Sequence, residues 1–416
     1  MNHKRKRPWR FLLLIFLLLV AFGTLFGKVR FGKEQTETIP MPFVSGDLLD
    51  DAISLFTGEP TEVRELKAQE VTGKEEGFYE YYFEQLNDDQ KRGYRQMLTA
   101  IRNREESFYV TVTGDDVTHV YSAVLKDHPE LFWIHNREHV YMTSYSNQDY
   151  SRFSPGYTYT EAEMNEILGS MESAYQSVRA MIPEEADTYR KVETVYTWVI
   201  DYCEYVVTEH DQSIAGVFWA KEAVCAGYAG AVKYLLDRLG IPCIYVEGDS
   251  SESSDGHAWN IVWIDGEPYI VDATNGDQPD FLQGNAAMLA EHKTTIMDYL
   301  CPFPEEYAAI YTPADEYQVP ACTAHADNFY VRNNACFDDY DWQKVYDLCR
   351  LRIDNNAAVV RFRFARQEDF ERAVSEWGEG DSASEVANYY MTRNGLDRVE
   401  YHFGVLDTFK TIYYIF

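Results

Sequence analysis

The chain has 416 residues, enough for two or three folded units, and 46% of them are hydrophobic and 25% charged, which excludes a disordered, collagen-like or multi-span membrane protein. The formal net charge is −31 at pH 7. Residues 1–33 contain eight basic side chains and no acidic one, so the rest of the chain carries all 68 acidic side chains and only 29 basic ones. Because such a body repels phosphate backbones and has no basic stripe, we expect no nucleic-acid binding.

The N-terminal end predicts export. A basic segment, 1–10, precedes the run 11–27, which contains no charge and only one polar side chain, Thr24. A helix of this length just spans a bilayer, and five basic residues before it against three after it favour a cytoplasmic N-terminus. We therefore expect a single-pass anchor in the cell membrane with the body extracytoplasmic. The alternative is a signal peptide cleaved near Ala21-Phe22-Gly23, which would make the body secreted.

Residues 28–182 are predicted to form a tether and then an α+β region. The tether, 28–77, is interrupted repeatedly by proline and glycine, with charges between them. In the region 78–182, Asn87 and the two acids after it mark the start of a helix. A strand over 107–113 is predicted from the alternation of its side chains. The other elements expected here are a helix over 115–126, strands within 131–143 and a helix over 160–182.

The cysteines and histidines give no sign of a metal site. No cysteines form a CxxC or a Cys/His set with metal-ligand spacing, and no phosphate-binding glycine loop is present, so we expect neither zinc nor a cofactor. The segment from His135 to His139 matches H-x-x-E-H, but its β-forming neighbours would not hold two histidines on one helical face. If one cysteine is a free nucleophile, six remain. The sequence allows these six either to form three disulfides or to be buried free thiols. The seven are Cys203, Cys225, Cys243, Cys301, Cys322, Cys336 and Cys349.

The unit 183–300 contains the candidate nucleophile. It is expected to begin with a second long helix, 184–206. A later helix is predicted from Val224 to Gly240, with Cys225 at its start. Unpaired backbone N–H groups and the positive end of the helix dipole stabilise a thiolate at such a position. The small residues that follow, Ala226, Gly227, Ala229 and Gly230, leave room for a substrate.

A β-hairpin after this helix brings an imidazole and a carboxylate together. Asp265-Gly266 between two apolar runs is a strong signal for a two-residue hairpin turn. In that register Asp272 faces Trp259. His257 lies two residues from Trp259 on the same face, so it is a diagonal neighbour of Asp272 within side-chain reach. A carboxylate beside an imidazole fixes its tautomer and stabilises the imidazolium, while the other ring nitrogen accepts a thiol proton.

The segments VCAGYAGAVKYLLDRLGIPCIYVEG, 224–248, and GHAWNIVWIDGEPYIVDAT, 256–274, resemble the core of the bacterial transglutaminase-like superfamily. The close resemblance covers roughly 214–277. It implies a papain-like fold in which Cys225 is the nucleophile, His257 the general base and acid, and Asp272 the orienting carboxylate. Relatives often have an aromatic residue where this chain has Asn275.

The rest of the chain is expected to contain a linker, 301–326, and a C-terminal α/β unit, 327–416. That unit is predicted to hold a strand soon after Asp327, helices over 341–353 and 367–377, a strand over 358–364, a further helix and a terminal strand within 399–416. The predicted fold class is therefore α+β. It comprises a papain-like transglutaminase core with an N-terminal α+β extension and a small C-terminal α/β unit, after one N-terminal transmembrane helix.

The superfamily includes crosslinking transglutaminases, peptidases, amidases and members without catalysis, so membership alone leaves the reaction open. We expect an exported cysteine acyl-transfer enzyme that hydrolyses peptide or isopeptide bonds in a protein or peptide of the cell envelope, attached to the membrane by its N-terminal helix. The alternatives are a protein-crosslinking transglutaminase and a non-catalytic module that binds an envelope polypeptide.

Overall fold

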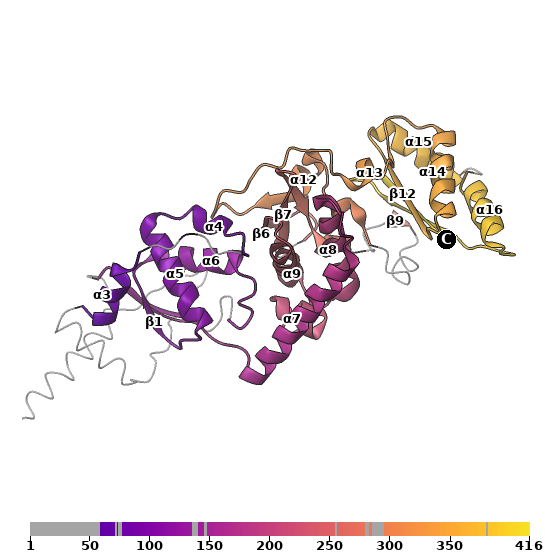
Figure 1. Ribbon diagram of the computed structural model, residues 1–416. Coiled ribbons are helices and arrows are strands. Elements are labelled where there is room, and N and C mark those ends of the chain that lie inside the picture. Colours follow the sequence, from indigo (N-terminus) through magenta and orange to yellow (C-terminus); the bar gives the residue numbers. More distant parts are fainter. Residues whose placement is uncertain are drawn as a thin grey trace, which may run out of the picture.

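The structure is a computed structural model that describes residues 59–416, apart from 71–72, 74–76, 135–139, 145–147, 254–255, 279–282, 285–294 and 380–381. The predicted anchor, the possible cleavage site and the two histidines of the H-x-x-E-H segment lie outside these residues. Within the described part of the chain, no helix has the length and apolar character needed to cross a membrane. The protein is mixed α+β, and its described parts follow one another in a row (Figure 1).

The N-terminal region combines helices with a small antiparallel sheet. Helix α5 begins as predicted, because the Asn87 side chain accepts a hydrogen bond from the Gln90 backbone and the Gln90 side chain accepts one from the Asn87 backbone. The sheet has the order β1-β3-β2. The elements are α3 (Thr61–Ala68), α4 (Tyr81–Glu84), α5 (Asp88–Arg102), β1 (Phe108–Val110), α6 (Asp115–Asp127), β2 (Tyr141–Ser144) and β3 (Ser151–Ser154).

The strand predicted from residue 131 onward is wrong for its first residues. The Leu131 N–H donates to the His128 carbonyl and the Ile134 N–H donates to the Leu131 carbonyl, so the chain turns here. The side chains of 131–134 are nevertheless buried in the core. Apolar character alone does not distinguish a buried turn from a buried strand. Strand β2 begins only at Tyr141.

The central unit is built on an antiparallel sheet with the order β10-β6-β7-β8. The predicted hairpin is confirmed, since Ile264 pairs with Glu267. Both turn residues have positive φ, 51° at Asp265 and 92° at Gly266, which is the conformation that an Asp-Gly turn supplies. The bounds are β6 (Cys243–Ser250), β7 (His257–Ile264), β8 (Glu267–Val271), α10 (Ala273–Gly276), η3 (Met297–Tyr299), α12 (Pro304–Ile310) and β10 (Tyr311–Pro313).

Three long helices accompany this sheet: α7 (Glu161–Met181), α8 (Thr188–Tyr202) and α9 (Cys225–Arg238). Helix α8 starts four residues later than predicted, because the Asp187 side chain caps it by accepting a hydrogen bond from the Arg190 N–H at 2.8 Å. It also ends earlier, and the chain enters β4 (Glu204–Tyr205), which runs parallel to β5 (Glu222–Ala223) after the π-helix η1 (Gly216–Ala220).

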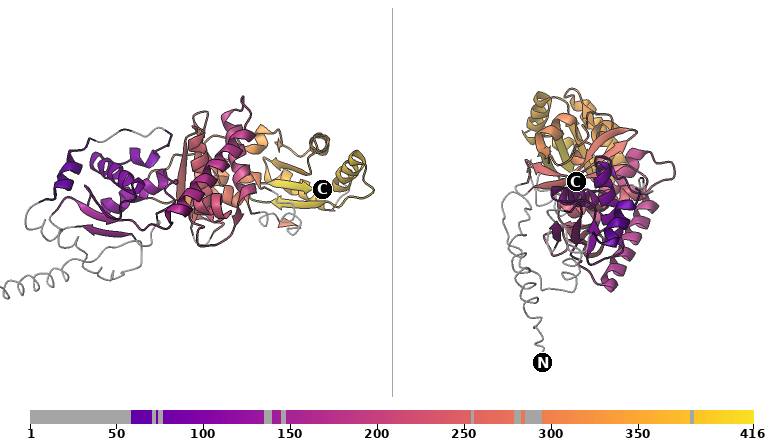
Figure 2. Two further views of the ribbon diagram at one scale, coloured as in Figure 1. Left: turned by 60° about the horizontal axis from the view of Figure 1, so that its bottom comes forward. Right: turned by 90° about the vertical axis from the view of Figure 1, so that its left-hand side faces the viewer.

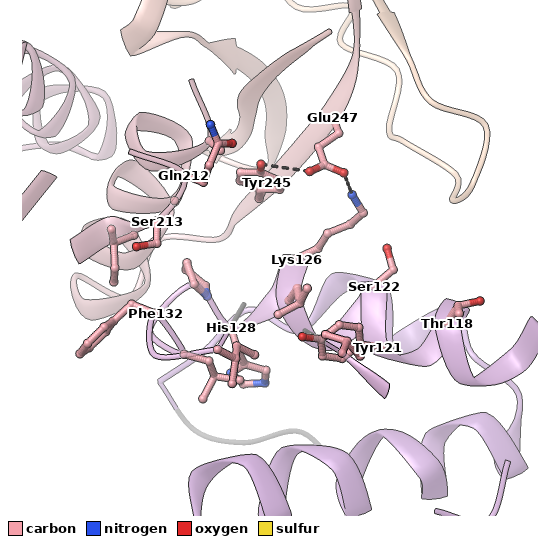
Figure 3. Close-up of a pocket in the computed structure, with 18 of the residues that line it drawn as sticks. Thr118, Tyr121, Ser122, Lys126, His128, Phe132, Gln212, Ser213, Tyr245 and Glu247 are labelled. Carbon is pink, nitrogen blue, oxygen red and sulfur yellow. Dashed lines mark hydrogen bonds and ion pairs between the residues drawn. The ribbon is translucent and has the colours of Figure 1, made fainter. Parts of the chain in front are cut away.

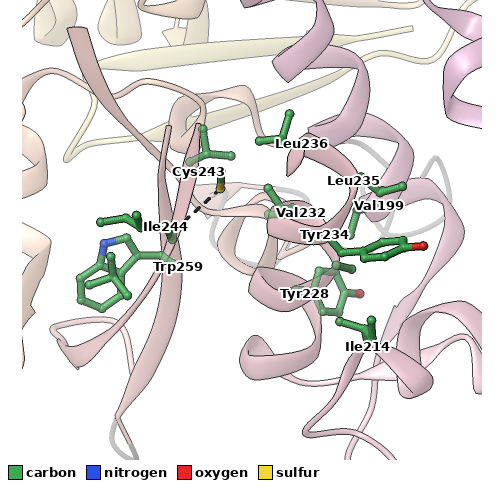
Figure 4. Close-up of a cluster of buried hydrophobic side chains, with 14 of the residues drawn as sticks. Val199, Ile214, Tyr228, Val232, Tyr234, Leu235, Leu236, Cys243, Ile244 and Trp259 are labelled. Atoms are coloured by element: carbon green, nitrogen blue, oxygen red, sulfur yellow. Dashed lines mark hydrogen bonds between the residues drawn. The ribbon is translucent and has the colours of Figure 1, made fainter. Parts of the chain in front are cut away.

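Helix α9 is held rigidly, because every residue from 227 to 237 is buried. Val232 and Leu236 point toward Cys243 on strand β6 (Figure 4). Each buried aliphatic side chain contributes about 1.5–3 kcal/mol. The Asn260 amide of β7 donates to the Ala229 carbonyl of α9 at 2.9 Å. Helix and sheet are therefore fixed to each other near the start of α9.

The C-terminal residues form a second hydrophobic core around the sheet β11-β12-β14-β13-β9 (Figure 2). Near Asp327 the chain forms the short helix α13 (Phe329–Arg332) before any strand, so the predicted order is wrong there; the Asn328 side chain starts this helix by capping Tyr330. The single terminal strand predicted within 399–416 is a hairpin. The remaining bounds are β9 (Gln283–Gly284), β11 (Cys336–Phe337), α14 (Trp342–Asp354), β12 (Val359–Phe364), α15 (Gln367–Glu379), α16 (Ser382–Asn394), β13 (His402–Leu406) and β14 (Thr411–Ile415).

Two segments cross the divisions expected from the sequence. Strand β9, from the stretch assigned to the central unit, pairs with β13 of the C-terminal sheet. The predicted linker contains helix α12 and strand β10, and β10 is an edge strand of the central sheet. All seven cysteines are free thiols.

Candidate active site

Cys225 is the first residue of α9, as predicted. Val224 precedes it in extended conformation. Its side chain does not cap the helix, so it does not satisfy the backbone N–H groups of the first turn. Gly227 allows the turn to pack closely against the preceding loop, since a Cβ there would lie 2.8 Å from the Asp211 carbonyl oxygen. Cys225 itself is half-buried, so the residue at the start of the helix is not enclosed in the core.

His257 and Asp272 meet as the hairpin register predicted. His257 Nε2 lies 2.7 Å from Asp272 Oδ2, and both side chains are buried. This contact leaves Nδ1 of the ring available to the Cys225 thiol, which is among the groups that raise the pKa of His257. Burial alone lowers the pKa of His257, but the charge and hydrogen bond of Asp272 and the contact with Cys225 outweigh it and raise that pKa to about 10. The imidazole is therefore protonated at neutral pH.

The Asp272 carboxylate is fixed from two further directions. It caps α10, where Oδ1 accepts a hydrogen bond from the Asn275 N–H at 3.1 Å. Oδ2 accepts a second bond from the Tyr311 hydroxyl at 2.5 Å. The Asn275 side-chain amide in turn donates to the Tyr311 oxygen at 3.3 Å. Asn275, where the resemblance implies an aromatic residue, thus contacts both Asp272 and Tyr311.

Aromatic rings pack around the imidazole. The His257 ring stacks on Trp259, with centroids 6.1 Å apart, and on Tyr311, with centroids 6.0 Å apart. Trp259 and Tyr311 also contact each other at 4.9 Å. Both are buried, so they hold the plane of the imidazole and exclude water from one side of it.

A cavity of about 470 Å³ lies beside the start of α9, between the N-terminal region and the central unit (Figure 3). Ala226 and Gly230 of α9 line it on one side. Lys126 of α6 forms an ion pair with Glu247 of β6, and the Tyr245 hydroxyl donates to the same carboxylate at 3.2 Å. The other lining residues are mainly apolar or aromatic and include Tyr121, Leu125, Pro129, Leu131, Phe132, Ile134, Val140 and Ile214.

Tyr311 was not among the residues predicted for the site. It lies in the stretch assigned to a linker, within the short run Ile310 to Thr312 before Pro313. That run is too short for its β-forming character to stand out from a loop. Within the described residues, no group of three or more His, Cys, Asp and Glu is arranged to hold a metal ion.

The similarity to known proteins lies in the part of the chain that contains these three residues. Residues 176–273 match the transglutaminase-like superfamily. Kyphoscoliosis peptidases of Mus musculus and Homo sapiens are 25% and 24% identical to this chain over 115 residues, which are 24% of this chain and only 17% of each relative. A crystal structure of a TGase is 13% identical and covers 40% of this chain and 50% of that chain, but its TM-score of 0.25 is too low to support any argument. The stretch 176–273, which contains Cys225, His257 and Asp272, belongs to the transglutaminase-like superfamily, as the resemblance predicted.

Proposed function

We propose that this protein is a cysteine acyl-transfer enzyme that hydrolyses peptide or isopeptide bonds with Cys225, His257 and Asp272 as its catalytic triad. The observation that carries the proposal is the 2.7 Å contact between His257 Nε2 and Asp272 Oδ2. The other ring nitrogen, Nδ1, is left for the Cys225 thiol at the start of α9. A buried imidazolium beside a thiol at a helix start stabilises the thiolate, which is the nucleophilic form.

The first half of the reaction uses the Cys225 sulfur and the His257 proton. The Cys225 sulfur attacks the carbonyl carbon of a substrate amide, and a C–S bond forms. The backbone N–H of Cys225, together with a second donor, stabilises the negative charge on the carbonyl oxygen. The C–N bond then breaks as the leaving nitrogen takes the proton of His257, and the amine departs from a thioester.

The second half decides between hydrolysis and transfer. Water gives a proton to His257 while its oxygen attacks the thioester, and a carboxylic acid and the Cys225 thiolate result. An amine in place of water would give a crosslink. We favour water because no dedicated amine site is recognisable among the residues beside the triad that the structure describes.

The cavity beside α9 supports a polypeptide acyl donor. Its volume is in the range of ligand sites, and its lining combines apolar and aromatic side chains with polar and charged ones such as Lys126, Glu247 and Glu316, which could bind the amides of a peptide. It lies next to Ala226, one residue from the nucleophile, so a bound chain would present an amide to Cys225. We further propose that the body is exported and membrane-anchored and that its substrate belongs to the cell envelope. This part of the proposal rests on the N-terminal sequence alone.

Product analysis tests this function. The purified full-length protein is incubated with a glutamine-containing peptide, a panel of cell-wall peptides and a labelled primary amine, and the products are identified by mass spectrometry. We expect cleaved peptide or released ammonia without amine incorporation. The Cys225→Ala variant should lose this activity, whereas Cys336→Ala, which removes another half-buried thiol far along the chain, should retain it.

The two alternatives give different results. Incorporation of the amine would instead establish a crosslinking transglutaminase. A non-catalytic binding module would give no product, and iodoacetamide would then label Cys225 no faster than Cys336.

A further inference from the structure

A buried tyrosine completes the contacts of the candidate triad. The Tyr311 hydroxyl lies 2.5 Å from Asp272 Oδ2, the same oxygen that lies 2.7 Å from His257 Nε2. Tyr311 is 3% exposed and Asp272 1% exposed, so water does not compete for that oxygen. A hydrogen bond from a neutral hydroxyl to a buried carboxylate is short and strong.

Asn275 supports both partners of this hydrogen bond. Its side-chain amide donates to the Tyr311 oxygen at 3.3 Å, while its backbone N–H donates to Asp272 Oδ1 at 3.1 Å. A carboxylate has no hydrogen to donate, so the Tyr311 hydroxyl is the donor to Asp272, and its oxygen accepts the bond from Asn275. Burial and the charge of Asp272 raise the pKa of Tyr311 well above its ordinary value, so the hydroxyl keeps its proton at neutral pH.

The chain delivers Tyr311 through a rigid edge strand. Tyr311 is the first residue of β10 and pairs with Ser250 of β6. Helix α12 precedes it directly and is held by a buried ion pair between Glu306 and Arg363 of the C-terminal unit. Tyr311 is buried, its hydroxyl contacts Asp272 and its ring packs on His257. It is therefore placed to act on the triad.

We propose that Tyr311 is a positioning residue that holds Oδ2 of Asp272 against the His257 ring, a role that rests on the proposed function of that triad. The hydroxyl prevents rotation of the carboxylate, and the stacked Tyr311 ring prevents rotation of the imidazole. Without the hydroxyl, Asp272 keeps only its Asn275 contact on Oδ1, and Oδ2 can turn away from His257. The imidazolium is then stabilised less, and so is the thiolate beside it.

The test uses Tyr311→Phe in the full-length protein, since this change keeps the stacked ring and removes only the hydroxyl. Two quantities are measured: kcat and KM for peptide hydrolysis, and the pH midpoint of Cys225 alkylation by iodoacetamide. We expect kcat to fall about ten- to hundredfold, as for loss of one hydrogen bond to a charged group, with KM unchanged. We expect the alkylation midpoint to move to higher pH.

Tyr414→Phe is the matched control, because it also removes a buried hydroxyl, but one that donates to the Ala383 carbonyl in the C-terminal core. It should leave kcat and the midpoint unchanged. If Tyr311→Phe fails to fold, Asn275→Ala serves instead: it keeps the backbone N–H to Asp272, removes only the donor to Tyr311, and should shift the midpoint in the same direction by less. A folded Tyr311→Phe variant with wild-type kcat and midpoint would overturn the proposal.

The alkylation measurement separates this inference from the proposed function. If no peptide is cleaved but the midpoint depends on both His257 and Tyr311, the positioning role stands and the reaction assignment fails. If His257→Gln leaves the midpoint unchanged, the triad itself is wrong, and the role of Tyr311 falls with it.

Discussion

Lys126 of helix α6 reaches across the cavity and forms an ion pair with Glu247 of strand β6. Its ammonium group also lies 5.7 Å from the centre of the Tyr245 ring. Lys126 is buried and Glu247 is partly exposed. The pair therefore connects the N-terminal region to the central sheet at the wall of the candidate substrate site.

Lys126→Met should weaken substrate binding more than chemistry. The change keeps the apolar stem but removes the ammonium group that pairs with Glu247, so the wall of the cavity changes shape while the triad is untouched. We expect KM for the peptide substrate to rise, with kcat and the rate of Cys225 alkylation unchanged. Steady-state kinetics decide this, and an unchanged KM would show that the substrate does not use this wall.

Ala226→Phe should block the cavity without disabling the nucleophile. Ala226 lines the cavity one residue from Cys225, and a phenyl group would fill space that the acyl donor needs. We expect kcat/KM for peptides to fall about tenfold or more, while the small reagent iodoacetamide still alkylates Cys225 at the wild-type rate. Ala308→Phe, at an exposed position of α12, is the control. Full peptide turnover in Ala226→Phe would exclude the cavity as the acyl-donor site.

The His257 proton predicts an alkaline limit to activity. The pKa of His257 is raised to about 10 in the folded protein, so the imidazolium that protonates the leaving amine is present at neutral pH and is lost as pH rises through about 10. We expect kcat/KM to decline over that range. A decline centred near pH 7 would mean that Asp272 and Cys225 do not stabilise the imidazolium.

The same proton contributes to folding stability. Because the folded pKa is above the unfolded value of about 6.5, the contribution is fully present below that value and is lost as pH rises through about 10. The unfolding free energy of the wild type, measured in urea, should therefore exceed that of His257→Gln at pH 6 by more than it does at pH 10. An equal difference at both pH values would contradict the assignment.

The ion pair between Arg363 and Glu306 should be essential to the junction of the C-terminal unit with α12. The two side chains are only 2% and 4% exposed. Arg363→Met leaves a buried carboxylate whose nearest remaining cation is Lys410 at 3.9 Å, and we expect a loss of about 3 kcal/mol or more in unfolding free energy. The double variant Arg363→Met/Glu306→Leu should recover much of it. Denaturation of the four members of this mutant cycle measures the coupling, and additive losses would show that the pair is not a unit.

The sequence by itself determined the β7–β8 hairpin and, through it, the contact between His257 and Asp272. Asp265-Gly266 selects the turn, and the two-residue period of the strands then places His257 beside Asp272. The start of α9 at Cys225 followed in the same way from the helical spacing after it. Each signal lies within a few adjacent residues, and the resemblance to a known superfamily covers the same stretch.

Only the tertiary structure decided what surrounds these three residues. Tyr311 contacts Asp272 across 39 positions of the chain, from a strand of three residues that is specified by pairing with β6 and not by its own composition. The cavity likewise depends on Lys126 and Glu247, which are 121 positions apart. Such contacts form because two preformed surfaces pack and satisfy each other's buried polar groups, and neither segment alone carries a local signal of its partner.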